Sequence, residues 1–202
     1  MLPAAMRSSR DNEEFPSFKV CICGEESVGK TALLNRYVTG SFHPGYRPTI
    51  AASFISSQEI VDYHVVILNI WDTAGQEKYQ SMMPLYLRNA DVVILVLDVT
   101  KLSSFRYVCK WYEVEYPNLH PHPTVYICAN KSDLDPAFDT SQIGEWAQSN
   151  QLSLFHTSAL SGVNVPALFK KIAQDMNSER LIKNKKKTSL SNPKENESRS
   201  CC

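Results

Sequence analysis

The sequence has no apolar run that approaches the roughly 20 residues of a transmembrane helix. It also lacks a net charge, because 21 lysines and arginines balance 21 aspartates and glutamates. No basic field for nucleic acid results, so we expect no nucleic-acid partner. The five histidines show no metal-site spacing, and no internal repeat is present. These absences favour a globular domain over membrane-spanning, nucleic-acid-binding or repeat proteins.

The chain of 202 residues is long enough for one domain with a substantial core, which we place at residues 17–177. Residues 1–16 are polar, lack a signal-peptide pattern and predict a disordered arm. Residues 178–202 contain few apolar side chains and predict a flexible basic tail. Cys21, Cys23 and Cys128 lie in apolar runs, where buried thiols are usual, so a reduced intracellular protein is expected.

Runs rich in Val, Ile and Leu alternate with segments of helical periodicity. Such runs are typical of strands buried on both faces of a parallel sheet. Residues 51–64 predict an additional edge strand. The predicted fold is α/β: a mixed, mainly parallel six-stranded sheet with helices on both faces. The predicted buried strands are residues 18–23, 64–71, 91–99 and 124–130, and the predicted helices are residues 30–40, 103–116, 140–150 and 164–177.

Residues 24–31, GEESVGKT, match the phosphate-loop pattern and stand between a predicted strand and a predicted helix. The glycines let backbone N–H groups point inward, and the helix N-terminus adds positive potential. Lys30 is expected to reach the terminal phosphates, and the Thr31 hydroxyl to bind Mg²⁺. A chance Gly-rich turn is the alternative, and the flanking strand and helix argue against it.

Residues 130–133, NKSD, follow another predicted strand, at the sheet edge where such folds bind ligands. The Asp133 carboxylate can accept two hydrogen bonds from the N1–H and 2-amino groups of guanine. Adenine offers no such pair and would leave a charged group unpaired. This segment therefore predicts selectivity for guanine.

Residues 71–77, WDTAGQE, form the third segment that directly follows a predicted strand. Asp72 is expected to hold Mg²⁺ through water, the Gly75 N–H to meet the γ-phosphate, and Gln76 to orient the attacking water. The predicted catalytic residues are Lys30, Gly75 and Gln76. A metabolic P-loop kinase or ATPase is a competing interpretation, which the segments NKSD and DTAGQE disfavour.

Over residues 18–177 the chain resembles a Ras-superfamily small GTPase of the Rab family, and residues 77–90 are similar to its endosomal branch. The resemblance implies that Phe42 closes over the guanine and Tyr46 lies over the phosphates. It further implies that Thr49 joins Thr31 and Asp72 around Mg²⁺, and that Ser158 and the Ala159 N–H support the base. The complete set of expected nucleotide contacts is Gly24, Glu26, Ser27, Val28, Gly29, Lys30, Thr31, Ala32, Phe42, Tyr46, Thr49, Gly75, Asn130, Lys131, Asp133, Leu134, Ser158, Ala159 and Leu160.

The chain departs from the Rab pattern at several positions. Glu26 stands where the superfamily usually has a small residue beside the γ-phosphate, and a carboxylate there repels a polyanion. A slowly hydrolysing GTP-bound recruitment module is therefore a second interpretation; in the opposing one, Glu26 turns outward and pairs with a cation such as Lys78. Ala51 replaces a usual glycine, and Leu160 replaces a lysine that covers the base.

The last two residues, Cys201 and Cys202, resemble a double geranylgeranylation site. Two lipids anchor stably where one anchors marginally, and the basic residues 185–187 add attraction to anionic lipid. The resemblance implies a monomeric GTP/GDP switch on the cytoplasmic face of endosomal or Golgi-related membranes, with a cytosolic pool. Its implied partners are effectors, an exchange factor, a GTPase-activating protein, a prenylation escort, a GDP-dissociation inhibitor and the membrane.

Overall fold

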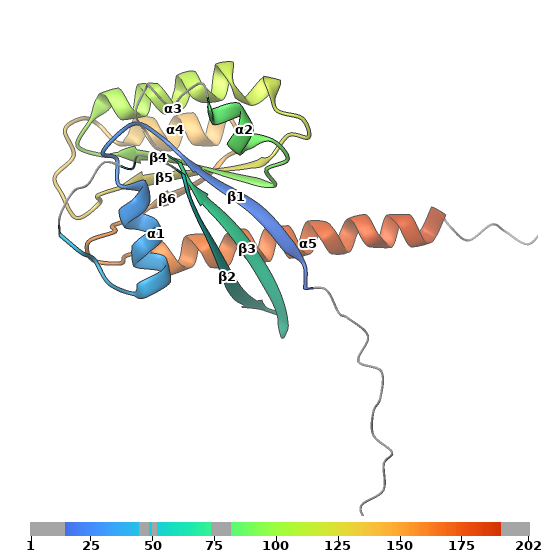
Figure 1. Ribbon diagram of the computed structural model, residues 1–202. Coiled ribbons are helices and arrows are strands. Elements are labelled where there is room, and N and C mark those ends of the chain that lie inside the picture. Colours follow the sequence, from blue (N-terminus) through green and yellow to red (C-terminus); the bar gives the residue numbers. More distant parts are fainter. Residues whose placement is uncertain (1–14, 45–48, 50–51, 74–81, 191–202) are drawn as a thin grey trace, which may run out of the picture.

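The computed structural model describes residues 15–44, 49, 52–73 and 82–190 (Figure 1). Strands and helices alternate along most of the chain, as the apolar runs predict. The elements are β1 (Ser17–Cys23), α1 (Lys30–Thr39), β2 (Ser53–Val61), β3 (His64–Asp72), α2 (Met83–Leu87), β4 (Val92–Asp98), α3 (Leu102–Val114), η2 (Tyr116–Asn118), β5 (Thr124–Asn130), α4 (Ser141–Ser149), β6 (Ser153–His156) and α5 (Val165–Leu190).

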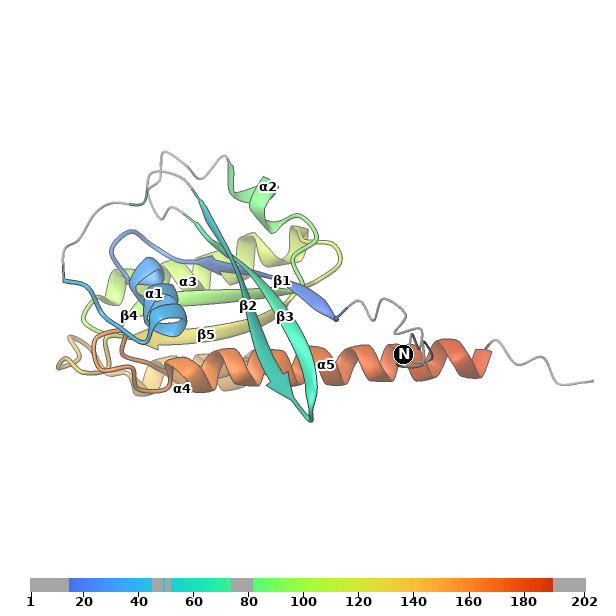
Figure 2. The ribbon, with the colours of Figure 1, turned by 60° about the horizontal axis from the view of Figure 1, so that its bottom comes forward.

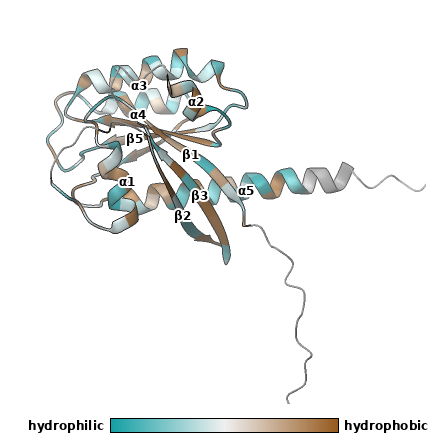
Figure 3. Ribbon diagram, in the orientation of Figure 1, coloured by the Kyte–Doolittle hydropathy of each residue, from teal (hydrophilic) through white to brown (hydrophobic). Residues whose placement is uncertain are grey.

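The strands form one six-stranded sheet in the order β2-β3-β1-β4-β5-β6. Strand β2 is antiparallel to β3 at one edge, whereas the other neighbouring strands run parallel. The predicted mixed sheet and its edge strand are therefore confirmed. Every residue of β4 is buried, which explains its continuous apolar sequence. Figure 3 shows apolar residues concentrated in the central strands.

Two apolar cores lie on opposite faces of the sheet, because successive side chains of a strand point to opposite faces. Val20 and Ile22 of β1 pack with residues of α1 and α5 on one face. Cys21 and Cys23 face the other core, which α3 and α4 complete. Trp111 of α3 belongs to this second core, and Trp146 packs against it. The parallel strands thus end together at one edge, between helices on both faces (Figures 1 and 2).

Helix α5 corrects one prediction. It continues to Leu190, so the expectation of a flexible segment from residue 178 was wrong for residues 178–190. The prediction relied on apolar residues, but the extension of an established helix needs only helix-forming side chains such as Glu, Arg, Leu and Lys. Lys183 Nζ also lies 3.7 Å from Oε2 of Glu179, one turn earlier, and such an ion pair supports the helix. No described helix combines the length and the apolar character needed to cross a membrane.

Candidate nucleotide-binding site

The loop between β1 and α1 has a backbone shape that requires its glycines. Gly24 and Gly29 have φ angles of 149° and 100°. A Cβ on Gly24 would lie 2.3 Å from the Val96 carbonyl oxygen, and one on Gly29 would lie 2.4 Å from Asn130 Nδ2. Ser27 also has a left-handed φ of 65°. These positions wrap the chain around the start of α1, as the phosphate-loop pattern predicts.

Lys30 is held inside this loop. Its Nζ donates hydrogen bonds to the carbonyls of Gly24 at 2.9 Å and Glu25 at 2.7 Å. Burial lowers the pKa of Lys30, while the charge of the nearby Asp72 opposes that shift. The ammonium is therefore fixed at the phosphate end of the site, where an anionic ligand would favour its charged form.

The three predicted magnesium ligands come together beside Lys30. Thr31 Oγ1 lies 2.8 Å from Thr49 Oγ1 and donates a 2.6 Å hydrogen bond to Asp72 Oδ2. Asp72 is fully buried, and its Oδ1 has no hydrogen-bond partner among the described residues. Burial is the largest influence on Asp72 and raises its pKa.

This donor set fits Mg²⁺, which binds through oxygen atoms and usually keeps several waters and phosphate oxygens. Two hydroxyls and one carboxylate supply too few ligands for a cage made of protein alone. The described residues contain no cluster of three or more His, Cys, Asp or Glu suited to a metal ion. The orphaned Asp72 Oδ1 supplies the uncompensated acceptor that a hydrated cation would satisfy.

Asn130 joins the phosphate loop to the base-binding loops. Its Nδ2 donates to the Val28 carbonyl at 2.9 Å. Its Oδ1 accepts hydrogen bonds of 3.2 Å from Thr157 Oγ1 and from the Ala159 N–H. All these groups are buried and cannot bind water, so each of these hydrogen bonds avoids the cost of an unsatisfied polar group. One side chain thus fixes three loops relative to one another.

Asp133 lies exposed at the far end of the site. One carboxylate oxygen accepts a short hydrogen bond from Ser158 Oγ. The Ser161 N–H in turn donates to the Ser158 hydroxyl at 3.0 Å, which orients that hydroxyl toward Asp133. The structure therefore brings the predicted base contacts Asp133, Ser158 and Ala159 into one corner.

Lys131 lies between these two regions. Its Nζ is 2.6 Å from Asp98 Oδ2 and donates to the Ser27 carbonyl at 2.9 Å. Asp98 is fully buried and also accepts two hydrogen bonds from Thr100. Sequence reasoning missed Asp98, although an Asp that directly ends a buried strand was a usable signal.

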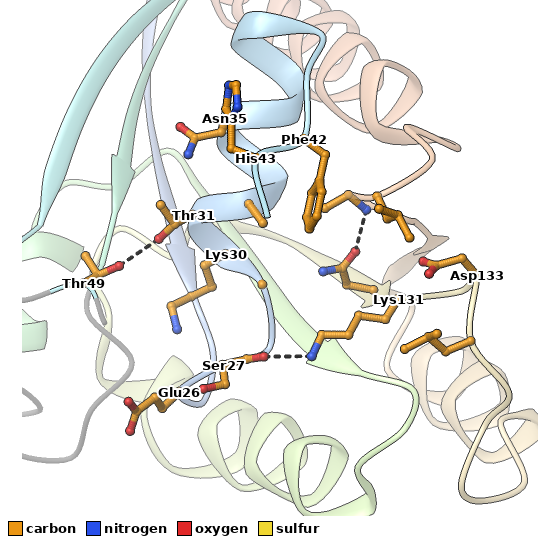
Figure 4. A pocket seen from close by; sticks show the side chains of 16 residues that line it. Glu26, Ser27, Lys30, Thr31, Asn35, Phe42, His43, Thr49, Lys131 and Asp133 are labelled. Carbon is orange, nitrogen blue, oxygen red and sulfur yellow. Dashed lines mark hydrogen bonds between the residues drawn. The ribbon is translucent and has the colours of Figure 1, made fainter. Parts of the chain in front are cut away.

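A cavity of 390 Å³ runs between the phosphate and base ends, within the size range of about 300 to 1,000 Å³ for ligand pockets. Figure 4 places Glu26, Lys30 and Thr49 toward one end and Asp133 toward the other. Phe42 and Leu160 also line the cavity, as predicted. Asn35 and His43 line it as well, and sequence reasoning missed both.

Other predicted residues divide into three groups. Ser27, Gly29, Ala32, Lys131, Leu134 and Ala159 line the cavity. Gly24, Val28, Asp72 and Ser158 do not line it and act from behind through the bonds described above. Tyr46, Gly75, Gln76, Cys201 and Cys202 lie outside the described residues, as do Ala51 and Lys78.

The fold and the site define a class of protein: α/β domains that bind a nucleotide through a phosphate loop. The phosphate loop, the Thr31 and Thr49 hydroxyls suited to Mg²⁺, and Asp133, suited to guanine, all face one cavity. The model of the Ras family matches residues 19–178. The chain is also 39% identical over 163 residues to the Ras-related protein Rab7 of Drosophila melanogaster, covering 78% of this chain and 79% of the relative. The chain belongs to the Rab family of Ras-superfamily small GTPases, and it is a GTP-hydrolysing enzyme.

Proposed function

We propose that this protein acts as a GTP/GDP switch in intracellular vesicle or endosomal membrane traffic. The observation that carries the proposal is the cavity lined at one end by Lys30 and Thr31 and at the other by Asp133. A guanine at Asp133 and a phosphate chain at Lys30 would together span that cavity. Bound Mg²⁺ would supply charge neutralisation at the phosphates, held by Thr31, Thr49 and, through water, Asp72.

The residues around the phosphates suggest how the switch is coupled to the ligand. Thr49 precedes β2 and reaches Thr31 of the phosphate loop through its hydroxyl. A γ-phosphate that engages Thr49 would hold the chain before β2, and its loss would release that segment. Gly75 and Gln76 would contact the γ-phosphate and orient the attacking water, an assignment that rests on the family resemblance.

Aromatic side chains near the end of β3, just before Gly75 and Gln76, support a surface for protein partners. Trp71 lies 5.1 Å from Phe54 and 6.1 Å from Tyr86, measured between ring centroids. Phe54 is 52% exposed, and exposed apolar clusters usually mark an interface. Effectors would bind here, and an exchange factor and a GTPase-activating protein would act on the same switch.

Membrane attachment would come from lipids on Cys201 and Cys202, assisted by the basic residues 185–187. This places the protein on the cytoplasmic face of endosomal or Golgi-related membranes. A prenylation escort and a GDP-dissociation inhibitor would handle the lipidated form and maintain its cytosolic pool.

A second candidate function differs from the first only in the rate of GTP hydrolysis. Glu26 lines the cavity and adds negative charge near Lys30. A carboxylate at this end favours a slowly hydrolysing, long-lived GTP-bound recruitment module over a rapidly cycling one.

Competition binding tests the proposal directly. Fluorescent GDP bound to the purified protein should be displaced by GTP and GDP but not by ATP, and bound GTP should turn into GDP. Lys30→Ala, which removes the ammonium from the phosphate end, should bind all three weakly. Equal competition by ATP would instead support a kinase or ATPase.

A further inference from the structure

We propose that Arg36 is a positioning residue for guanine recognition, an inference that rests on the nucleotide site proposed above. Arg36 lies on α1 and does not itself line the cavity. Its guanidinium instead binds three carbonyl oxygens from two segments, each of which contributes a lining residue to the base end of the cavity. Nε donates to Ala159 at 2.7 Å, Nη1 donates to Gly40 at 2.6 Å, and Nη2 donates to Leu160.

The first anchored segment is the loop that follows β6. Ala159 and Leu160 line the cavity, and the Ala159 N–H points to Asn130 Oδ1. A guanine that offers its N1–H and 2-amino group to Asp133 must turn its 6-oxygen toward this loop. Fixing the Ala159 carbonyl fixes the plane of the next peptide, and with it the direction of the Leu160 N–H that can meet that oxygen. Fixing the Leu160 carbonyl likewise fixes the Ser161 N–H, which holds the Ser158 hydroxyl beside Asp133.

The second anchored segment is the exit of α1. Gly40 caps the helix in a left-handed conformation, and its N–H donates to the Arg36 carbonyl at 3.0 Å. Two residues later, Phe42 lines the cavity at the same end (Figure 4). Arg36 therefore holds Gly40 through both its main chain and its side chain. This constrains the position of Phe42, two residues further along the chain.

The geometry requires arginine. A planar guanidinium presents five N–H donors in a fixed fork and can bridge several carbonyls, whereas a lysine ammonium is a single flexible point charge. Arg36 is only half-buried, and the apolar contacts of α1 with the core come from Leu33, Leu34 and Tyr37. Its removal should loosen the base end of the site without dismantling the core, since water can reach the freed carbonyls.

The test uses the full-length protein, with Arg36→Met to remove the guanidinium and keep the apolar stem, and Arg36→Lys to keep the charge. Arg106→Met, an exposed arginine of α3, is the matched control. The probes are GDP and the diphosphate of 2-aminopurine riboside, which lacks the 6-oxygen and the N1–H of guanine; the lost N1–H contact to Asp133 is common to all variants, so it cancels when the preference of each variant is compared with that of wild type. Affinities for both, and the dissociation rate of fluorescent GDP, are measured alongside thermal unfolding.

Arg36→Met should release GDP about tenfold faster and reduce the preference for GDP over the 2-aminopurine analogue by about tenfold, the worth of one hydrogen bond. Arg36→Lys should fall between it and wild type, and Arg106→Met should match wild type. Equal weakening of both probes would show a merely structural role and overturn the proposal, as would unchanged GDP release. Failure of the wild-type protein to bind GDP would instead overturn the nucleotide site itself.

Discussion

Lys131 Nζ lies 2.6 Å from Asp98 Oδ2, and this ion pair joins the base-binding loop to the end of the neighbouring strand. The parallel register of β4 and β5 pairs Asp98 with Asn130, which brings the two charges to the same edge of the sheet. Because Lys131 also holds the Ser27 carbonyl, the pair links the base end of the site to the phosphate loop. Asp98 therefore supports nucleotide binding without touching the cavity.

This pair predicts a stability that depends on pH. Burial would raise the pKa of Asp98, but hydrogen bonds from Lys131 and Thr100 outweigh burial and hold it below its usual value. A folded-state pKa below the unfolded one gives stabilisation that is complete above about pH 4 and is lost as the pH falls through the folded value. As the pH falls below about 4, wild type should lose free energy of unfolding more steeply than Asp98→Asn.

Urea unfolding of the GDP-bound proteins across that range measures this difference. Asp135→Asn, an exposed position in the loop that follows Lys131, serves as the control and should run parallel to wild type. Parallel curves for wild type and Asp98→Asn would contradict the role of the ion pair.

Local patterns predicted most of the site, whereas contacts between distant segments escaped prediction. The phosphate loop and the Asn-Lys-x-Asp loop are each contiguous in sequence, so their chemistry can be read directly. Asp98 and Lys131 are 33 positions apart, and Arg36 reaches Ala159 across 123 positions. Only the parallel register and the packing of α1 beside the last loop bring these partners together.

The extent of α5 escaped prediction for another reason. Apolar periodicity locates the part of a helix that packs against a core. Here that signal fades near Met176, the last buried apolar residue among those helix residues up to 184 whose burial is described. Beyond it, residues with high helix propensity extend a helix whose costly nucleus already exists. Apolar periodicity therefore cannot detect helical residues that do not pack against the core.

Replacing Asp133 by Asn should exchange the base preference. An amide can donate a hydrogen bond to the 2-oxygen of xanthine, but it cannot accept two hydrogen bonds from guanine. We expect GDP affinity to fall by roughly a hundredfold or more and xanthosine diphosphate to bind better than GDP. Titration of both nucleotides measures this, with Asp135→Asn as the matched control. Wild-type GDP affinity in the Asp133 variant would show that this loop does not read the base.

Deleting Cys201 and Cys202 should abolish membrane attachment. The described fold is complete without them, so the shortened protein should remain folded and bind nucleotide with wild-type affinity. Fractionation of cells that express both forms measures the membrane-bound share. Replacing Cys201 alone should give weak, reversible binding, because a single lipid anchors marginally. Cys109→Ser controls for loss of a thiol elsewhere, and unchanged membrane recovery after the deletion would exclude the lipid anchor.

The two carboxylates of the phosphate loop occupy different surroundings. Glu25 Oε2 accepts a 3.3 Å hydrogen bond from Ser103 Oγ of α3 and does not line the cavity. Glu26 lines the cavity at its phosphate end (Figure 4). A carboxylate there would repel the γ-phosphate and crowd both Gln76 and any arginine finger supplied by a GTPase-activating protein, and such a finger accelerates hydrolysis by about 10³ to 10⁵.

Glu26→Ser should therefore speed hydrolysis while leaving GDP binding largely unchanged. Removing the repulsion should raise the single-turnover rate by about tenfold, equivalent to about 1.4 kcal/mol of barrier. The gain should be larger with a matched GTPase-activating protein, because its arginine would then have room to enter. Glu25→Ser removes the same charge from the adjacent residue and should leave the rate near that of wild type. Identical rates for wild type and Glu26→Ser, with and without the activator, would show that Glu26 does not restrain the cycle.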